Sequence, residues 1–186
     1  MMIVAEGLAI EGVYPEVSLK AGAGTLTVVA GSAGSGRTSL LLTLAGRMKP
    51  TKGALNVAGH AGRRAIRKAV ALALIDGVTD LDRSLTVGEH LRERRRRPYQ
   101  EILERVGLAG QERTLVRELD REQRVRLGLA LALLDEPEVI VADNVDAGLP
   151  ADRQQALWNL LRSLGRTVVA SCVTPPARYD ELVELS

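Results

Sequence analysis

Residues 24–39 read GTLTVVAGSAGSGRTS, and this stretch carries the strongest fold signal in the chain. Its first part, Gly24–Ala30, is rich in β-branched side chains, which favour an extended strand. A glycine-rich turn follows, and from Leu40 to Met48 leucines recur at helical spacing. A strand, a glycine-rich loop and a helix in this order are typical of a phosphate-binding loop. The stretch therefore predicts an α/β fold built around such a loop.

The loop fits the P-loop pattern at every position except one, because Arg37 stands where the pattern has lysine. Its glycines allow backbone N–H groups to approach a phosphate without hindrance from a Cβ atom. The helix that begins near Arg37 would add its N-terminal dipole, and the Thr38 hydroxyl would bind Mg²⁺. The alternative is a flexible Gly-Ser turn; the flanking strand and helix favour the phosphate loop. The expected nucleotide-binding residues are Gly31, Ser32, Ala33, Gly34, Ser35, Gly36, Arg37, Thr38 and Ser39.

Apolar segments further along the chain alternate between strand-like and helix-like patterns. Strands are predicted at Ala54–Ala58, Ala69–Ile75, Val139–Ala142 and Thr167–Ser171. For Ala69–Ile75, periodicity alone does not separate a buried strand from a helix. Helices are predicted at Arg121–Leu134 and Ala151–Leu164, with two short ones in Thr86–Val106, interrupted at Pro98. This alternation implies a mostly parallel sheet with helices on both faces.

Composition narrows the class of protein. The 186 residues are 46% hydrophobic and 26% charged, as in ordinary globular proteins, and predict a single domain over residues 1–186. A net charge of +2 and an aromatic content of 2% are too low for a dedicated nucleic-acid surface, so no nucleic acid is expected. Cys172 has no second cysteine to pair with, and His60 and His90 offer no zinc cluster.

Two observations predict a cytoplasmic location. The apolar runs are shorter than the roughly 18–20 residues of a membrane span. The N-terminal sequence MMIVAEGLAIEG also lacks the basic leader of a secretory signal.

Three stretches resemble the ATP-binding cassette (ABC) ATPases, the nucleotide-binding subunits of ABC transporters. Residues 17–42, VSLKAGAGTLTVVAGSAGSGRTSLLL, look like the family's strand, P-loop and leucine-rich helix. Residues 49–59, KPTKGALNVAG, look like its next strand, and residues 116–149 look like its signature helix, Walker B strand and D-loop. The resemblance implies a P-loop NTPase fold with a mostly parallel sheet flanked by helices. It adds a short antiparallel N-terminal part and a small helical insertion near residues 76–118.

The resemblance also decides between two candidate Walker B carboxylates. Asp135, in LLDEP, looks like the family's Walker B ending, but an apolar strand would then stand where the family has its polar D-loop. If Asp143, after Val139–Ala142, is the Walker B carboxylate instead, the spacing of Gln123, Pro137 and Gly148 agrees with that of the family's motifs. The resemblance therefore implies that the loop binds ATP and that Thr38 and Asp143 hold Mg²⁺.

Two departures from the family concern the nucleotide directly. Arg37 replaces the lysine that contacts the β and γ phosphates, and arginine does not substitute for lysine without changing the geometry. Asn144 occupies the position of the catalytic glutamate and cannot accept a proton, so no catalytic residue is expected.

Further departures concern the motifs that complete the family's site. The signature L-S-G-G-Q reads LDREQ at Leu119–Gln123, and its Asp120 and Glu122 would repel an anion. Asp76 lies near the position of the Q-loop glutamine, and Cys172 near that of the switch histidine. The D-loop, 147–150, lacks its aspartate.

These departures imply an ATP-binding subunit that hydrolyses ATP slowly or not at all. The resemblance implies docking on an integral-membrane transporter subunit at the inner face of the membrane, and a homodimer or heterodimer of ATPase subunits. Because the signature is altered, we favour a heterodimer with an intact partner. Two alternatives stay open: an interaction or regulatory protein that kept the fold without nucleotide binding, and a P-loop NTPase or kinase of another family.

The remaining features have packing or surface interpretations. Core packing is expected for Tyr14, which is misplaced for adenine stacking, and for Trp158 and the Cys172 thiol. A polar loop without the spacing of a calcium site is expected for Asp76, Asp80 and Asp82. A solvated basic face is expected for Arg92 and Arg94–Arg97, although an acidic segment of a membrane subunit or anionic headgroups could use it.

Overall fold

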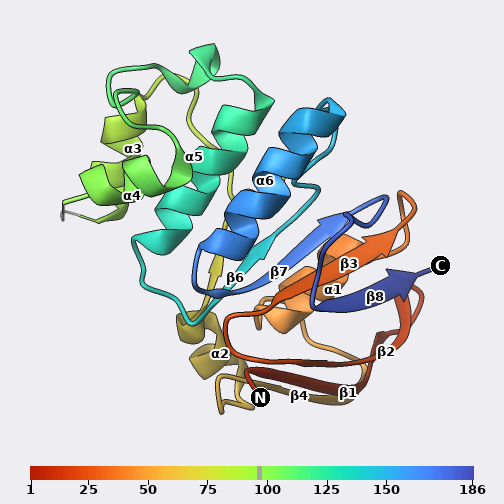
Figure 1. Cartoon of the computed structure of the whole chain (residues 1–186). Coiled ribbons are helices and arrows are strands. Elements are labelled where there is room, and N and C mark those ends of the chain that lie inside the picture. The colour runs from red at the N-terminus through yellow and green to blue at the C-terminus, as the bar shows by residue number, and fades with distance from the viewer. Residues whose placement is uncertain (96–97) are drawn as a thin grey trace.

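The computed structural model describes residues 1–95 and 98–186 and has a five-stranded sheet at its centre (Figure 1). In spatial order the strands are β5 (Val70–Leu72), β6 (Val139–Ala142), β7 (Thr167–Cys172), β3 (Leu26–Gly31) and β8 (Glu181–Leu185). All neighbouring strands in this sheet run parallel. The prediction of a mostly parallel sheet is confirmed.

A smaller antiparallel sheet packs against the central one. Its strands, in the order β2, β1, β4, are β2 (Tyr14–Ala21), β1 (Ile3–Ile10) and β4 (Lys52–Val57). The antiparallel N-terminal part that the resemblance implied is therefore present. The turn between β1 and β2 brings Gly12 and Val13 to the rim of the P-loop.

Helices cover both faces of the central sheet, as predicted. They are α1 (Arg37–Leu44), α2 (Arg63–Ala69), α3 (Val87–Arg94), α4 (Gln100–Val106), α5 (Arg121–Leu133) and α6 (Ala151–Ser163), with a 3₁₀ turn η1 at Val116–Glu118. Figure 1 shows α5 and α6 over one face, with α3 and α4 beyond α5, and α1 with the antiparallel sheet on the other side. Within the described part of the chain, no helix is both long and apolar enough to cross a membrane.

The central strands bury side chains on both faces, which explains their continuous apolar sequences. Successive residues of a strand point to opposite sides of the sheet. Accordingly, Val28 and Ile140 belong to the core under α5 and α6. Val29 and Val141, one position later in the same strands, belong to the core shared with α1 and the antiparallel sheet.

Most predicted strands and helices agree with the structure to within two residues at each end, but two differ by more. The first helix ends at Leu44 instead of Met48, because the chain turns at Gly46, where φ is +67°. Ala69–Ile75 is not one strand: Ala69 ends α2, and only Val70–Leu72 is strand. After that strand the Thr79 hydroxyl donates to the Ala73 carbonyl at 2.7 Å and helps to turn the chain out of the sheet.

The core predictions are confirmed, since Tyr14, Trp158 and Cys172 expose 4%, 3% and 0% of their surface. The Tyr14 hydroxyl donates to Thr43 Oγ1 at 3.0 Å, so its ring is fixed in the interior.

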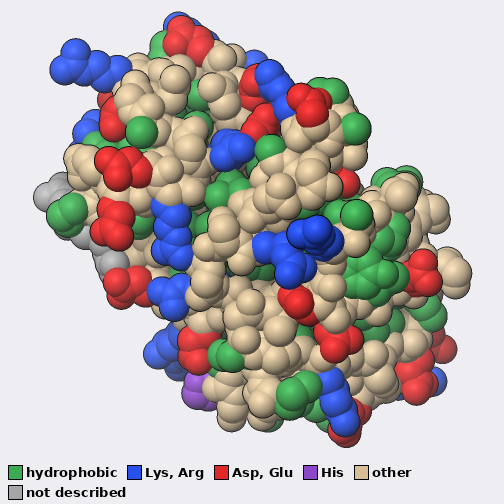
Figure 2. All heavy atoms as spheres, in the orientation of Figure 1, with side chains coloured by type: hydrophobic (Ala, Val, Ile, Leu, Met, Phe, Trp, Pro, Cys, Tyr) green, Lys and Arg blue, Asp and Glu red, His purple; other side chains and the backbone are tan. Residues whose placement is uncertain are grey.

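In the predicted basic face, Arg92, Arg94 and Arg95 are exposed. Arg96 and Arg97 lie outside the described residues. Figure 2 shows basic and acidic side chains scattered together over one face of the molecule.

Candidate functional site

The predicted nucleotide-binding residues, Gly31–Ser39, run from the carboxyl end of β3 through a loop into the first turn of α1. Gly34 and Gly36 have φ values of +85° and +89°, in the left-handed region that favours glycine. A Cβ atom on Gly36 would also lie 2.4 Å from the Val13 carbonyl oxygen. Gly36 therefore lets the loop turn sharply while it packs against the turn between β1 and β2.

A cavity of about 440 Å³ lies above this loop. It is lined by Gly12, Val13, Ala33, Gly34, Gly36, Arg37, Thr38, Ser39 and Asn144. The structure thus brings most of the predicted loop residues together with Asn144 from far along the chain. Gly31, Ser32 and Ser35 do not line this cavity. The sequence did not predict the contribution of the turn at Gly12–Val13.

Asp143 follows β6 directly and lies against Thr38, the other residue expected to hold Mg²⁺. The Thr38 hydroxyl donates to Asp143 Oδ2 at 2.5 Å, and the Ser171 hydroxyl donates to Asp143 Oδ1. Asp135 lies elsewhere, where it accepts hydrogen bonds from Arg94 and Arg95. The structure therefore places Asp143, and not Asp135, beside the loop.

The oxygens of Thr38 and Asp143 fit a magnesium ion. Mg²⁺ prefers oxygen ligands and usually keeps several waters, so it takes one or two protein oxygens together with phosphate oxygens. The Thr38 hydroxyl oxygen lies 2.5 Å from Asp143 Oδ2, so both oxygens can contact one ion beside the loop. Among residues 1–95 and 98–186, no cluster of three His, Cys, Asp or Glu side chains offers a self-sufficient metal site.

Two polar atoms near the loop have unused hydrogen-bonding capacity. Arg37 is only 7% exposed, and its Nη1 is buried without a hydrogen-bond partner in the described structure. The same holds for Ser35 Oγ. An unpaired buried donor costs roughly 1–3 kcal/mol. Arg37 lines the cavity, where phosphate oxygens would supply acceptors, so it fits an anionic ligand, whereas Ser35 lies outside the lining of the cavity.

Arg37 also acts electrostatically on two buried groups, Asp146 and Cys172. Burial raises the pKa of Asp146, while a hydrogen bond from Trp158 Nε1 at 3.3 Å and the charge of Arg37 oppose the rise. Burial, followed by the charge of Asp146, raises the pKa of Cys172 to about 12. The thiol therefore stays protonated and is not a nucleophile near neutral pH. The sequence did not single out Asp146.

Asn144 is held in place by two elements that the sequence analysis did not connect with it. Its backbone N–H donates to Ser171 Oγ at 2.9 Å, and its carbonyl accepts from Arg121 Nη2 at 3.1 Å. Its φ is +46°, so the backbone is strained there. Ser171 is the last residue of the predicted strand Thr167–Ser171 and lies in β7, which pairs with β6, and this strand prediction was the available signal. Nothing in the sequence indicated the bond from Arg121.

The acidic residues of the altered signature are ion-paired within the chain. Asp120 caps α5 by accepting from the Gln123 amide at 2.9 Å, and Arg153 Nη1 donates to it at 2.7 Å. Glu122 pairs with Arg126 at 2.6 Å and lies 3.6 Å from Arg153. The expected repulsion of an anion by these carboxylates is therefore weakened by their arginine partners.

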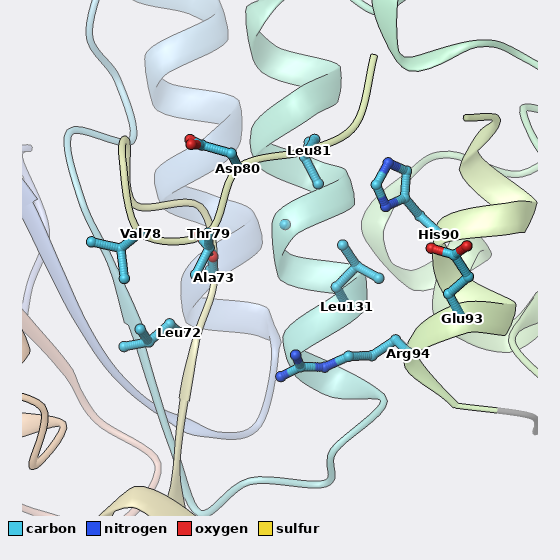
Figure 3. Close-up of a pocket in the computed structure, with 11 residues that line it drawn as sticks. Leu72, Ala73, Val78, Thr79, Asp80, Leu81, His90, Glu93, Arg94 and Leu131 are labelled. Atoms are coloured by element: carbon cyan, nitrogen blue, oxygen red, sulfur yellow. The ribbon is translucent and has the colours of Figure 1, made fainter. Parts of the chain in front are cut away.

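A second cleft, of about 360 Å³, separates the carboxyl end of β5 from α3 (Figure 3). It is lined by Leu72, Ala73, Val78, Thr79, Asp80, Leu81, His90, Glu93, Arg94, Gly128 and Leu131. Figure 3 shows polar side chains of α3 on one side and mostly apolar side chains on the other. Gly128 allows α5 to pack closely against the chain that follows β5, because a Cβ atom at this position would lie 2.8 Å from the Leu74 nitrogen.

Comparisons with known proteins agree with this architecture. Residues 14–147 match the family described as ABC transporter. Taurine import ATP-binding protein TauB from Yersinia pestis is 32% identical over 158 residues, which are 81% of this chain and 62% of that protein. Daunorubicin resistance ATP-binding protein DrrA3 from Streptomyces coeruleorubidus is 33% identical over 184 residues, 90% of this chain and 57% of that protein. The chain thus spans about three fifths of the length of these relatives.

The fold is also similar to that of solved structures. The structure of cbiO1 from Clostridium perfringens, part of the ABC transporter complex cbiONQ, has a TM-score of 0.82 and 18% sequence identity. The match covers 99% of this chain and 84% of cbiO1. At this identity the likeness concerns the fold alone.

Proposed function

This chain belongs to the ABC transporter family, and from that membership we infer that it is an ATP-binding subunit that binds Mg-ATP and hydrolyses it slowly or not at all. The observation that carries the proposal is the contact between Thr38 and Asp143 at the mouth of a glycine-rich loop. Arg37 supports it as well, because it lines the cavity and its buried Nη1 has no hydrogen-bond partner among the described residues.

In the proposed complex, the phosphates accept hydrogen bonds from backbone N–H groups of Gly31–Ser39. The N-terminus of α1 adds its dipole to this cradle. Arg37 donates to a phosphate oxygen, which removes the cost of its unpaired Nη1. Thr38 and Asp143 hold Mg²⁺, which neutralises phosphate charge when it is bound.

Weak hydrolysis follows from Asn144. Its amide can position a water molecule but cannot take the proton that the attacking water must lose. Its backbone is fixed by Ser171 and Arg121, so the side chain stands at the rim of the cavity as a neutral group. In a chain arranged in this way, nucleotide binding is retained while the step that needs a general base is slow.

A membrane partner completes the proposed assembly. We take the single domain 1–186 to contain a reduced helical subdomain near residues 76–118, and we assign the second cleft beside α3 to a segment of a membrane subunit. The chain would then lie on the cytoplasmic face of the membrane through that partner. Because its own signature is altered, a heterodimer with an intact ATPase subunit is the proposed arrangement.

Thermal unfolding in the presence of nucleotide tests the binding part of the proposal. Mg-ATP at about 100 times its dissociation constant stabilises a protein by roughly 2.7 kcal/mol, which raises the midpoint by several degrees. The shift is expected in wild type and in Asp135→Asn, the control carboxylate. It is expected to be lost in Asp143→Asn and Arg37→Ala, each measured against its own midpoint without ligand.

The outcomes separate the proposed function from its alternative. A Mg²⁺-dependent shift that disappears only in the loop and Asp143 variants supports nucleotide binding. No shift at millimolar ATP contradicts it and favours an interaction protein that kept the fold. Hydrolysis is tested separately with Asn144→Glu, which should increase phosphate release; rapid release by the wild type would contradict the assignment of Asn144.

A further inference from the structure

A cavity with cationic walls lies at the edge of the central sheet opposite the P-loop. It has a volume of about 380 Å³ and is lined by Arg47, Arg67, Lys68, Val70, Ala71, Arg94, Arg95, Asp135 and Pro137. Val70 begins β5, and Pro137 lies just before β6, so the cavity is at the amino ends of these strands. The P-loop follows the carboxyl end of β3, which runs in the same direction. Figure 1 shows α2 at this far edge.

The charges around this cavity are strongly unbalanced. Five cationic side chains and one carboxylate give a local net charge of +4, whereas the whole chain has a net charge of +2. The carboxylate, Asp135, already accepts from both Arg94 and Arg95. In the described segments of the chain, Arg47 and Lys68 have no ion pair with an acidic side chain.

The fold itself holds these cations close to one another. Arg67 Nε donates to the Gly46 carbonyl at 2.8 Å, and Arg63 Nη2 donates to the Arg47 carbonyl at 3.1 Å. These bonds fix α2 against the end of α1. Among the residues that the structure describes, the terminal nitrogens of Arg67 make no hydrogen bond or ion pair. Burial, followed by the charges of Arg67 and Arg94, lowers the pKa of Arg47. An anion in the cavity would relieve this repulsion.

We propose that this cavity binds a small anion that carries one or more phosphate groups. Guanidinium groups match phosphate oxygens through paired hydrogen bonds, and a lysine ammonium adds a compact charge. The volume lies within the roughly 300–1,000 Å³ of small-molecule sites. The phosphate group belongs either to a soluble compound or to an anionic lipid headgroup. The site is separate from the P-loop and does not depend on ATP binding there.

Modification of Lys68 by an acetylating reagent tests the proposal with a local readout. Inorganic pyrophosphate is the probe, sodium chloride of equal ionic strength is the reference, and Lys20, exposed on β2, is the internal control. Pyrophosphate at ten times its dissociation constant should slow acetylation of Lys68 about tenfold by mass action and leave Lys20 unchanged. Mass spectrometry measures both sites in one sample.

A pair of matched variants makes this test specific. Arg47→Gln should abolish most of the protection of Lys68, whereas Arg113→Gln, which removes the same charge from an exposed position elsewhere, should preserve it. The unfolding midpoint of each variant checks that the fold is intact. Equal slowing at Lys68 and Lys20, no slowing at Lys68, or equal protection in both variants would overturn the proposal.

Vesicles identify the source of the phosphate. If pyrophosphate and vesicles that contain phosphatidylserine both protect Lys68, and vesicles of phosphatidylcholine alone do not, the proposal holds with a lipid headgroup as the ligand. If pyrophosphate protects Lys68 and both kinds of vesicle leave it reactive, the proposal holds with a soluble ligand. If only vesicles protect Lys68 and pyrophosphate does not, the cavity is no phosphate site and the proposal fails.

Discussion

Replacing Gly36 by alanine, with Gly34→Ala as a matched control, tests how the loop is built. The two glycines have nearly equal φ values, +89° and +85°, so alanine is strained alike at both, by about 1–2 kcal/mol. Only at Gly36 does the new Cβ meet other atoms, at 2.4 Å from the Val13 carbonyl oxygen and 2.6 Å from Tyr14 Cβ. Nothing lies within 4 Å of the corresponding position at Gly34.

The clash at Gly36 adds about 1–3 kcal/mol, as overpacking does elsewhere. We therefore expect Gly36→Ala to lower the free energy of unfolding by about 2–5 kcal/mol and Gly34→Ala by about 1–2 kcal/mol. Urea unfolding followed by the fluorescence of Trp158, the single tryptophan, measures both values. Equal destabilisation by the two variants, within about 0.5 kcal/mol, would refute the packing of the loop against the turn between β1 and β2.

Three further predictions concern stability. Because the pKa of Cys172 rises from 9.0 to about 12 on folding, the folded state favours the protonated thiol. Wild type should lose stability as the pH rises above 9.0, and Cys172→Ala should lose less in unfolding measured across that range. Trp158→Phe removes the donor to buried Asp146 and should cost about 1 kcal/mol in urea unfolding near neutral pH. Asp120→Ala removes the cap of α5 and should cost about 1 kcal/mol. Since the Gln123 amide and then Arg153 lower the pKa of Asp120, that difference should vanish in unfolding measured as the pH falls below 3.8.

The elements that the sequence predicted well have strong local signals. The P-loop is recognisable from its glycines, and Val139–Ala142 is recognisable as a buried strand because all four residues are apolar. The helix α2 and the strand β8 were missed. Only Ile66 and Ala69 are buried in α2, so its sequence shows little helical periodicity. The strand β8 exists through its pairing with β3, a contact distant in sequence.

The sequence predicted which residues lie at the site, but it did not predict most of the side-chain contacts that they make. The position of Asp143 beside Thr38 follows from strand order, since the carboxyl ends of parallel strands meet at one edge. The hydroxyl of Ser171 and the guanidinium of Arg121 act on Asn144 and its neighbour through tertiary contacts that no local pattern encodes. The ion pairs of Asp120 and Glu122 with Arg153 were hidden for the same reason.

The most direct test measures bound ATP and released phosphate in one sample. Purified protein is equilibrated by dialysis with Mg²⁺ and ATP labelled at the γ phosphate, and both species are counted over time. If the proposed function is right, the wild type retains ATP that stays intact while bound, and Asp143→Asn does not retain it. If the wild type retains no ATP, or converts it rapidly to phosphate, the chain is not a nucleotide-binding subunit with weak hydrolysis.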